Sequence, residues 1–286
     1  MPISQDTPIG GATARSLGAR LEAGRLEASR LARGAAIQAR NIRVMLLRNM
    51  MMRYGRDNIG FIWVILEPMI LTGGVMLIWS VMGPNRNGLR VVELVLTGYM
   101  PLTLWRHLTG GVIFLFRSSS PLLYHRQITL FDIVYAKQAL EFLGPTAALA
   151  VVWGTLNVAG AVADIQQPGL FILGWLMMGM IGASFGMVLA ALTEVSHTSE
   201  RFIQPMQYLL IPVSGAFFMV DWMPPWAQHL LMFNPLVHPY EVFRAGYFGD
   251  AVVTHYWLPY FFAWVFVLFV LGIWSVNKVR PHVQLS

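Results

Sequence analysis

Residues 45–70 read MLLRNMMMRYGRDNIGFIWVILEPMI and mark the change from a charged amino-terminal segment to an apolar chain. The first half of this stretch scatters Arg48, Arg53 and Arg56 among methionines and leucines. That composition is typical of a helix lying at the lipid headgroup level, with its guanidinium groups in water or on phosphates. The second half is apolar, so the stretch predicts an interfacial helix followed by entry into a bilayer.

The composition of the chain predicts an integral membrane protein. Of 286 residues, 56% are hydrophobic and only 12% are charged, and the mean hydropathy is +0.56. These values lie outside the usual range for a soluble globular domain. The chain has no cysteine, which excludes a disulfide framework, a thiolate nucleophile and a cysteine-ligated metal.

Six apolar segments each come near the roughly 20 residues that a helix needs to cross hydrocarbon. They are residues 59–82, 91–116, 140–163, 169–193, 203–221 and 256–277. An even number of crossings places both chain ends on one side of the membrane. Sixteen basic residues then lie on that side and four lie outside or within the spans. The positive-inside rule therefore predicts cytoplasmic amino and carboxyl ends.

The net charge of +6 reflects membrane orientation rather than a nucleic-acid-binding face, because ten of the twenty basic residues precede Ile59. The predicted domains are an arginine-rich cytoplasmic tail, residues 1–40, and a six-helix transmembrane domain, residues 41–286. Arginines in the tail recur every five residues from Arg15 to Arg30. Each step advances about 140° around a helix, so they do not share one face. A solvated helix is expected, either without a specific function or in contact with a partner or anionic lipid.

Two connections between the apolar segments are long. Residues 117–139 mix polar and apolar side chains and are predicted to be cytoplasmic, as a helix docked on another protein or as a loop resting on the membrane. Residues 222–255 contain four prolines and many aromatic residues. Irregular backbone cannot face lipid, so these residues predict a re-entrant or interfacial pair of short helices packed on protein.

The second of these short helices is predicted to begin at Asn234, which would act as its N-cap before a proline at the first helical position. His238, Glu241 and Arg244 then recur at three-residue spacing along one face. His238 with Glu241 is the only pair in this region suited to acid–base chemistry.

Enzyme and metal motifs are weak. Residues 182–186, GASFG, match G-x-S-x-G, but a nucleophile elbow requires a strand, a sharp turn and a helix, whereas these residues lie inside an apolar span. With Gly179 and Ala190 they also fit the small-xxx-small pattern of close helix packing. The seven histidines form no metal-binding spacing, and Lys137 and Lys278, the only lysines, follow no glycine of a P-loop. We therefore expect no catalytic residue, metal or cofactor in this chain; if its function needs ATP, a separate subunit would have to bind the nucleotide with Mg.

Charged and aromatic residues within the spans point to a conduit, since a charge facing lipid is costly. Glu67 and Arg106 would lie at similar depths, roughly 12 and 15 Å from the cytoplasmic side at 1.5 Å per residue, and are predicted to pair. Arg106 could instead face the conduit and attract an anionic group, or extend toward the interface. Aromatic rings that could stack on sugar faces, or serve only as packing or belt residues, are Trp63, Tyr99, Trp105, Trp222 and Trp226.

Two sets of residues are similar to a known family. The first set is Arg53-Tyr54, Gly60, Trp63 and Glu67-Pro68. The second set runs from Gln204-Pro205 through Ser214-Gly215, Pro224, Asn234-Pro235, His238, Glu241 and Arg244. At these spacings they resemble permease subunits of type-2 ABC exporters of polysaccharides, most closely the capsular polysaccharide export permeases. The resemblance extends from about Arg40 to the carboxyl end.

The resemblance implies a homodimer paired with two copies of an ABC ATPase subunit in the bacterial inner membrane. It also implies periplasmic co-polymerase-type and outer-membrane export partners. Residues that would couple to the ATPase subunit are Arg53, Tyr124, His125, Arg126 and Gln127. Residues at the outer gate would be Asn234, His238, Glu241 and Arg244.

The sequence thus predicts an all-α, six-span permease that exports a lipid-linked capsular polysaccharide. An interfacial helix would precede the first span, and short outer helices would precede the last. Alternatives are a permease for O-antigen, teichoic acid or a small hydrophobic compound, and a membrane-embedded transferase acting on lipid-linked sugars.

Overall fold

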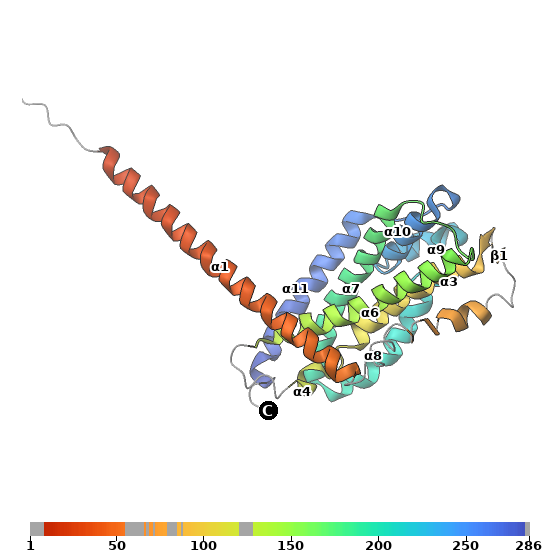
Figure 1. The fold of residues 1–286 in the computed structure, drawn as a ribbon, viewed down its shortest axis with the longest axis horizontal. Coiled ribbons are helices and arrows are strands. Elements are labelled where there is room, and N and C mark those ends of the chain that lie inside the picture. The colour runs from red at the N-terminus through yellow and green to blue at the C-terminus, as the bar shows by residue number, and fades with distance from the viewer. Residues whose placement is uncertain are drawn as a thin grey trace, which may run out of the picture. The chain divides into compact units, whose positions relative to one another are not determined.

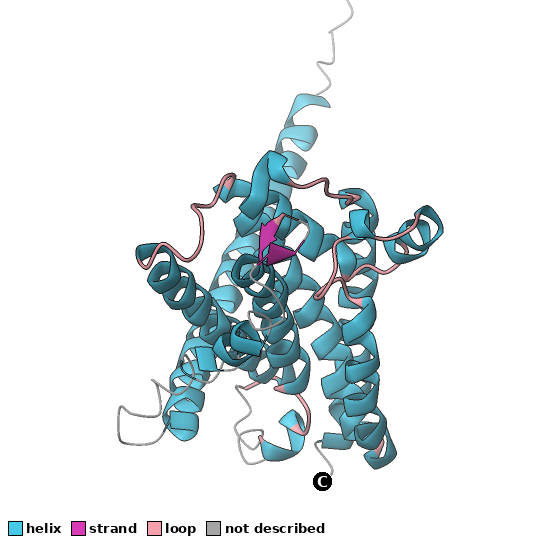
Figure 2. Cartoon of the chain, turned by 90° about the vertical axis from the view of Figure 1, so that its right-hand side faces the viewer, coloured by secondary structure: helices cyan, strands magenta, loops and turns pink. Residues whose placement is uncertain are grey.

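The structure, a computed structural model, describes residues 9–54, 66, 69–70, 72–78, 85–86, 88–119 and 128–283. These residues are helical except for connecting turns and one short ribbon, in which β1 (Asn85–Arg86) pairs antiparallel with β2 (Leu89–Arg90) (Figure 2). The predicted all-α class is therefore confirmed for the described part of the chain. The chain divides into two units, Met1–Val44 and Met45–Ser286.

The helices are labelled in Figure 1. Their bounds are α1 Ile9–Tyr54, α3 Val91–Gly110, α4 Leu115–Ser118, α6 Leu130–Val158, α7 Pro168–Val195, α8 His197–Leu210, α9 Pro225–Met232, α10 Val237–Phe248 and α11 Leu258–Val283. Single 3-10 turns are η1 Ile211–Val213, η2 Val220–Trp222 and η3 Gly249–Ala251.

Three helices in the described part are long and apolar enough to cross a membrane, namely α6, α7 and, over Leu258–Pro281, α11. Helix α3 has 20 residues, enough for about 30 Å, and carries Glu93, Arg106 and His107. The predicted first span, residues 59–82, lies mostly outside the described residues. Of that range, residues 72–78 are helical.

Helix α6 begins ten residues earlier than the predicted span 140–163. Thr129 and Asp132 form a capping box, in which the Asp132 N–H donates to Thr129 Oγ1 at 3.2 Å and the Thr129 N–H donates to Asp132 Oδ2 at 3.0 Å. This reciprocal cap stabilises a helix start at Leu130. The connection predicted over 117–139 is therefore shorter than expected, with α4 at its start.

The predicted span over 203–221 is not one continuous helix. Helix α8 ends at Leu210, and η1 follows with Pro212 inside it. Gly215 then has φ +95°, a conformation that side chains rarely adopt. A proline without an N–H and a glycine with positive φ together end the helix here, so the chain turns back toward α10.

Helix α7 is the central element of the second unit and packs against α11, α10 and α3 (Figure 1). Its contact with α10 is backbone on backbone: a Cβ added at Gly246 would lie 2.1 Å from the Phe171 nitrogen, and one at Gly174 would lie 2.4 Å from the Phe243 nitrogen. The rings of Phe171 and Phe243 stack with centroids 4.2 Å apart. This close approach fixes α10 to the centre of the bundle.

The GASFG segment lies in the middle of α7. The Ser184 hydroxyl donates to the Met180 carbonyl of the same helix at 2.8 Å. A Cβ at Gly182 would lie 2.9 Å from Leu108 Cδ1, and one at Gly186 would lie 2.6 Å from the Leu108 carbonyl oxygen. The predicted close helix packing is therefore confirmed, with α3 as the neighbour.

Candidate functional site

A polar cleft of about 300 Å³ opens between the carboxyl-terminal half of α3, the amino-terminal part of α6 and α8. Its walls are made by charged, amide, hydroxyl and glycine residues. From α3 and its C-cap come Tyr99, Thr103, Arg106, His107, Gly110 and Gly111. Helix α6 contributes Lys137 and Glu141, and α8 contributes Gln204 and Gln207. A polar cavity of this size among apolar helices is suited to a polar ligand.

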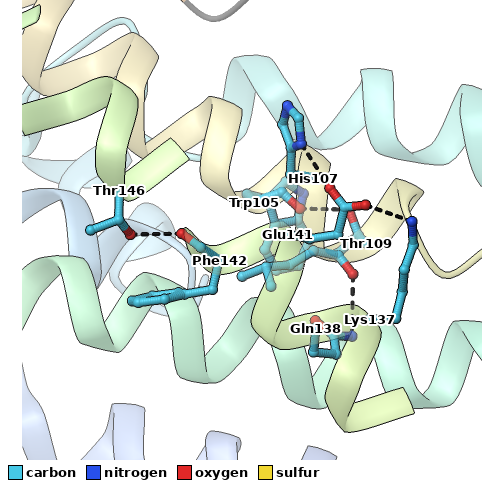
Figure 3. A network of polar contacts seen from close by, with 9 residues as sticks. Trp105, His107, Thr109, Lys137, Gln138, Glu141, Phe142 and Thr146 are labelled. Atoms are coloured by element: carbon cyan, nitrogen blue, oxygen red, sulfur yellow. Dashed lines mark hydrogen bonds and ion pairs between the residues drawn. The ribbon is translucent and has the colours of Figure 1, made fainter. Parts of the chain in front are cut away.

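Glu141 is the centre of the polar network in this cleft (Figure 3). His107 Nδ1 lies 2.9 Å from Glu141 Oε2, and Lys137 Nζ lies 2.7 Å from Glu141 Oε1. Figure 3 shows the two side chains reaching the carboxylate from different sides. The Glu141 side chain is only 2% exposed, so its charge is neutralised by an adjacent cation rather than by water.

Gly111 provides the space for this network. A Cβ at Gly111 would lie 2.8 Å from Glu141 Cδ. Because Glu141 pairs with Lys137 four residues earlier, α6 itself holds the ion pair, and α3 contributes His107 across the helix contact.

Arg106 forms no ion pair, and Gln207 Nε2 no hydrogen bond, with any described residue. The Arg106 side chain is exposed, and its guanidinium carbon lies 5.6 Å from the Tyr208 ring centroid. No carboxylate among the described residues forms an ion pair with it. Gln207 is 6% exposed, and its Nε2 has no hydrogen-bond partner within the described part of the chain. With Glu141 neutralised by Lys137, Arg106 leaves the described walls of the cleft with a net positive charge.

Arg244 holds the segment that follows η1. Its Nη1 donates to the carbonyls of Gly215 at 2.7 Å and Phe218 at 2.5 Å, and its Nη2 donates to the Ala216 carbonyl at 2.8 Å. Gly98 of α3 allows this segment to approach, since a Cβ there would lie 2.0 Å from the Ala216 oxygen. The segment is thus wedged between α3 and α10.

Glu241 ties two further segments to α10. One carboxylate oxygen accepts from the Val220 N–H at 3.2 Å and the other from the His255 N–H at 2.9 Å. Burial raises the pKa of Glu241, and the nearby Arg244 charge opposes that rise. Residues 220 and 255 are therefore linked through one buried side chain.

His238 bridges α9 and the start of α11. Its Nδ1 accepts from the Trp257 N–H at 3.2 Å, so Nε2 carries the hydrogen and donates to the Met232 carbonyl at 3.2 Å. Burial lowers the pKa of His238. Because both its ring nitrogens and both oxygens of Glu241 are engaged with backbone groups, this pair is not arranged as an acid and base facing a substrate.

Asn234 does not act as the predicted N-cap. Helix α10 begins at Val237, and Asn234 instead opens a turn in which its Oδ1 accepts from the Leu236 N–H at 3.0 Å. Its Nδ2 donates to the Val213 carbonyl at 2.9 Å. The side chain therefore joins the turn before α10 to η1.

The predicted conduit residues separate into three groups. Tyr99 and Arg106 line the cleft, while Tyr99 also meets Trp222 and Arg244 around a void of about 10 Å³. Trp105 is buried and stacks on Phe185 with centroids 5.4 Å apart. Trp226, in α9, is 73% exposed.

Several predicted residues lie outside what the structure describes. These are Trp63, Glu67, Tyr124, His125, Arg126 and Gln127. The backbone of Arg53 is part of α1, and its side chain is not described. The predicted pairing of Glu67 with Arg106 and the coupling role of residues 124–127 therefore remain predictions.

Among the cleft residues that sequence reasoning did not assign to a conduit are His107, Lys137, Glu141 and Gln207. Glu141 could have been found, because it is the second residue of the predicted span 140–163 and follows a lysine by four positions. The involvement of His107 and Gln207 depends on how α3 and α8 pack against α6, which no local pattern reveals.

Comparison with known proteins agrees with this architecture. Residues 40–248 match the family model described as ABC-2 type transporter. The chain is 34% identical over 246 residues to the capsule polysaccharide export inner-membrane protein CtrC of Neisseria meningitidis serogroup A, covering 86% of this chain and 93% of CtrC. It is 30% identical, with the same coverage, to the capsule polysaccharide export inner-membrane protein BexB of Haemophilus influenzae.

A more distant relative is the polysialic acid transport protein KpsM of Escherichia coli, 21% identical over 223 residues, which cover 75% of this chain and 85% of KpsM. The family match includes all the described cleft residues, from Tyr99 to Gln207, and Arg244 with the three carbonyls that it binds. The chain belongs to the ABC-2 type transporter family.

Proposed function

We propose that this chain is the membrane-spanning subunit of an ATP-driven exporter that moves a lipid-linked capsular polysaccharide from the cytoplasm to the periplasm. The observation that carries the proposal is the similarity to CtrC, which extends over nearly the whole of that capsule export protein. The membrane location of these relatives, together with the apolar helices, supports a multi-pass protein of the bacterial inner membrane.

The cleft supports a polar cargo. A polysaccharide presents hydroxyl groups and, where acidic, negative charges. The cleft offers amides, hydroxyls and the exposed guanidinium of Arg106. Such groups exchange hydrogen bonds with a sugar chain more readily than an apolar wall would.

In this proposal the chain crosses the membrane six times, with both ends in the cytoplasm. The distribution of basic residues supports that orientation, because arginines concentrate in the amino-terminal segment. Residues 45–58 would lie at the cytoplasmic interface, and α9 and α10 would form the re-entrant outer pair before α11. The cleft, near the end of α3 and the start of α6, would then face the cytoplasm.

The motor would be a separate ABC ATPase subunit, since the sequence offers no P-loop lysine for ATP. Two permease copies would pair with two ATPase copies, and nucleotide-driven closure would shift the pair between inward-open and outward-open states. Arg53 and residues 124–127 would contact the ATPase. Co-polymerase-type and outer-membrane export proteins would receive the polymer in the periplasm.

The outer gate in this proposal is a rigid frame built on α10. Arg244, Glu241 and His238 each hold backbone groups of a different neighbouring segment. Asn234 joins the turn before α10 to η1. Movement of α10 would therefore carry these segments as one body.

The test is complementation in a capsule-producing strain that lacks its own export permease. We expect surface polymer to be restored when the chain is expressed with its ATPase subunit, and polymer to stay in the cytoplasm when the P-loop lysine of that subunit is replaced. Ser184→Ala should export normally, because its hydroxyl only bonds within α7.

Three outcomes would contradict the proposal. Export without any ATPase would contradict the need for a separate ATPase subunit. Export of O-antigen, teichoic acid or a small hydrophobic compound in place of capsule would contradict the proposed substrate. Modification of lipid-linked sugar by the purified chain alone would favour a transferase.

A further inference from the structure

A second cavity adjoins the polar cleft. It has a volume of about 430 Å³ and lies between α4, α6 and the carboxyl-terminal part of α1. Gly111 and Lys137 line both cavities, so they form the boundary between the two spaces. Arg48 and Asn49 line the second cavity and not the cleft.

Each cavity contains a cation, and a third lies where the two cavities meet. Arg48 lies in the second cavity, Lys137 at the shared boundary and Arg106 in the cleft. Glu141 is the carboxylate among the lining residues, and it is held by Lys137 at 2.7 Å and His107 at 2.9 Å. The described walls therefore carry an excess of positive charge from Arg48 to Arg106.

A buried donor on the cleft wall also lacks an acceptor. Gln207 Nε2 has no hydrogen-bond partner among the described residues, and the side chain is 6% exposed. A buried polar atom without a partner is costly, because it has lost its hydrogen bonds to water. An oxygen atom of a ligand in the cleft would satisfy it once the amide rotates toward the cleft, whereas an apolar ligand would not.

We propose that the cleft is a binding site for a phosphate-bearing ligand, which approaches along the second cavity past Arg48 and Lys137 and is held by Arg106 and Gln207. Phosphate oxygens accept charge-assisted hydrogen bonds from guanidinium and ammonium groups. The cleft has room for the phosphate and a hydroxyl-bearing unit joined to it. The inference rests on the proposed function, since it names the part of the cargo that this site would hold.

The phosphate could belong to a lipid headgroup or to a sugar phosphate, and the experiment separates the two. The full chain is placed in phosphatidylcholine nanodiscs and titrated with dihexanoyl phosphatidic acid or with glucose 1-phosphate. Dihexanoyl phosphatidylcholine and glucose serve as probes without net negative charge. The shift in thermal unfolding temperature gives an apparent dissociation constant for each probe.

We expect at least one phosphate probe to bind, and its affinity to fall about tenfold or more in Arg106→Gln, as for a lost charge-assisted hydrogen bond. Lys137→Gln should weaken binding, while Lys137→Arg should restore it. Lys278→Gln is the matched control, because its ammonium lies over the Trp274 ring, 5.0 Å from the centroid, and lines neither cavity.

Each outcome decides the proposal. Binding of phosphatidic acid alone identifies a lipid headgroup, and binding of glucose 1-phosphate identifies a sugar phosphate. Equal binding of the probes without net negative charge, or equal affinity in Arg106→Gln and wild type, would overturn it. Complementation by the wild-type chain is scored separately, so restored polymer export without phosphate binding would refute this site and leave the proposed function intact.

Discussion

Arg244 is the residue on which the segment after η1 depends. It is 1% exposed and donates to three carbonyls between 2.5 and 2.8 Å. A buried arginine is costly unless its donors are satisfied. Here Nη1 and Nη2 are satisfied by backbone carbonyls that the broken helix would otherwise leave unpaired, while Nε has no hydrogen-bond partner among the described residues. The cation and the irregular backbone therefore stabilise each other.

Arg244→Gln should lower the free energy of unfolding by roughly 3 kcal/mol, because it leaves buried carbonyls without donors. Arg90→Gln is the matched control, since Arg90 is exposed and reaches the carbonyls of Gly160 and Ala161 only at 3.4 Å. Its effect should be below about 1 kcal/mol. Thermal unfolding of both variants in nanodiscs measures these changes. Equal losses of stability in the two variants would contradict the role of Arg244 in holding the segment after η1.

His238 predicts a pH dependence of stability. Its folded-state pKa is lowered, so below the ordinary histidine value of about 6.5 the unfolded state binds the proton more readily. Stability is therefore complete above that pH and is lost as pH falls toward the folded-state pKa. Protonated Nδ1 would also face the Trp257 N–H, donor against donor.

Unfolding midpoints measured between pH 7.5 and 5.0 should fall less in His238→Gln than in wild type. His229→Gln, at an exposed position of α9, is the control and should keep the wild-type slope. Identical slopes in wild type and His238→Gln would show that His238 does not cause the pH dependence of stability.

At the scale of elements, the contact between α7 and α10 leaves no room for a larger side chain at its glycines. Gly246 touches the Phe171 backbone, and Gly174 touches the Phe243 backbone. Since α10 holds the segments bound by His238, Glu241 and Arg244, any shift of α10 against α7 moves all of them.

Gly246→Ala should destabilise the protein by about 1–3 kcal/mol, because its Cβ would meet backbone that cannot give way. Gly169→Ala, in the first turn of α7 with nothing within 4 Å, is the matched control. That change should be neutral or stabilising by up to about 1 kcal/mol, since alanine favours the helix. Denaturation of both variants in one detergent tests the prediction, which fails if Gly246→Ala is neutral.

At the scale of the molecule, α11 presents an apolar surface. Its long span is only 17% buried within the described chain, and its exposed side chains include Trp264, Phe266 and Trp274. Such a surface in water would promote aggregation, whereas in a bilayer it matches the acyl chains. Unlike the cleft, α11 carries no charged or amide side chain between Phe261 and Trp274.

The absence of cysteine allows a direct test of orientation. Single cysteines at the exposed positions Gln167 and Asp250 should react with an impermeant maleimide in cells whose outer membrane has been opened. Cysteines at Ala36 and Asn277, also exposed, should react only after the inner membrane is disrupted. Labelling of Gln167 and Asn277 from the same side would contradict six crossings with cytoplasmic ends.

The membrane class and the helical fold follow from the sequence because hydropathy and helix length are local properties. Apolar runs such as 169–193 predict α7 closely, since twenty or so apolar residues have few other stable conformations in lipid. The close packing at residues 182–186 was also predictable, because small residues at this spacing serve few other purposes in an apolar helix.

What the tertiary structure decided is where polar groups find partners. Arg244 meets Gly215, 29 positions away, and His107 meets Glu141, 34 positions away. The sequence placed Arg106 in a predicted span and Arg244 on one face of a predicted short helix, but it could not show which groups they contact. Their contacts depend on which helices pack together, and that choice is made by the summed packing of distant side chains rather than by any local pattern.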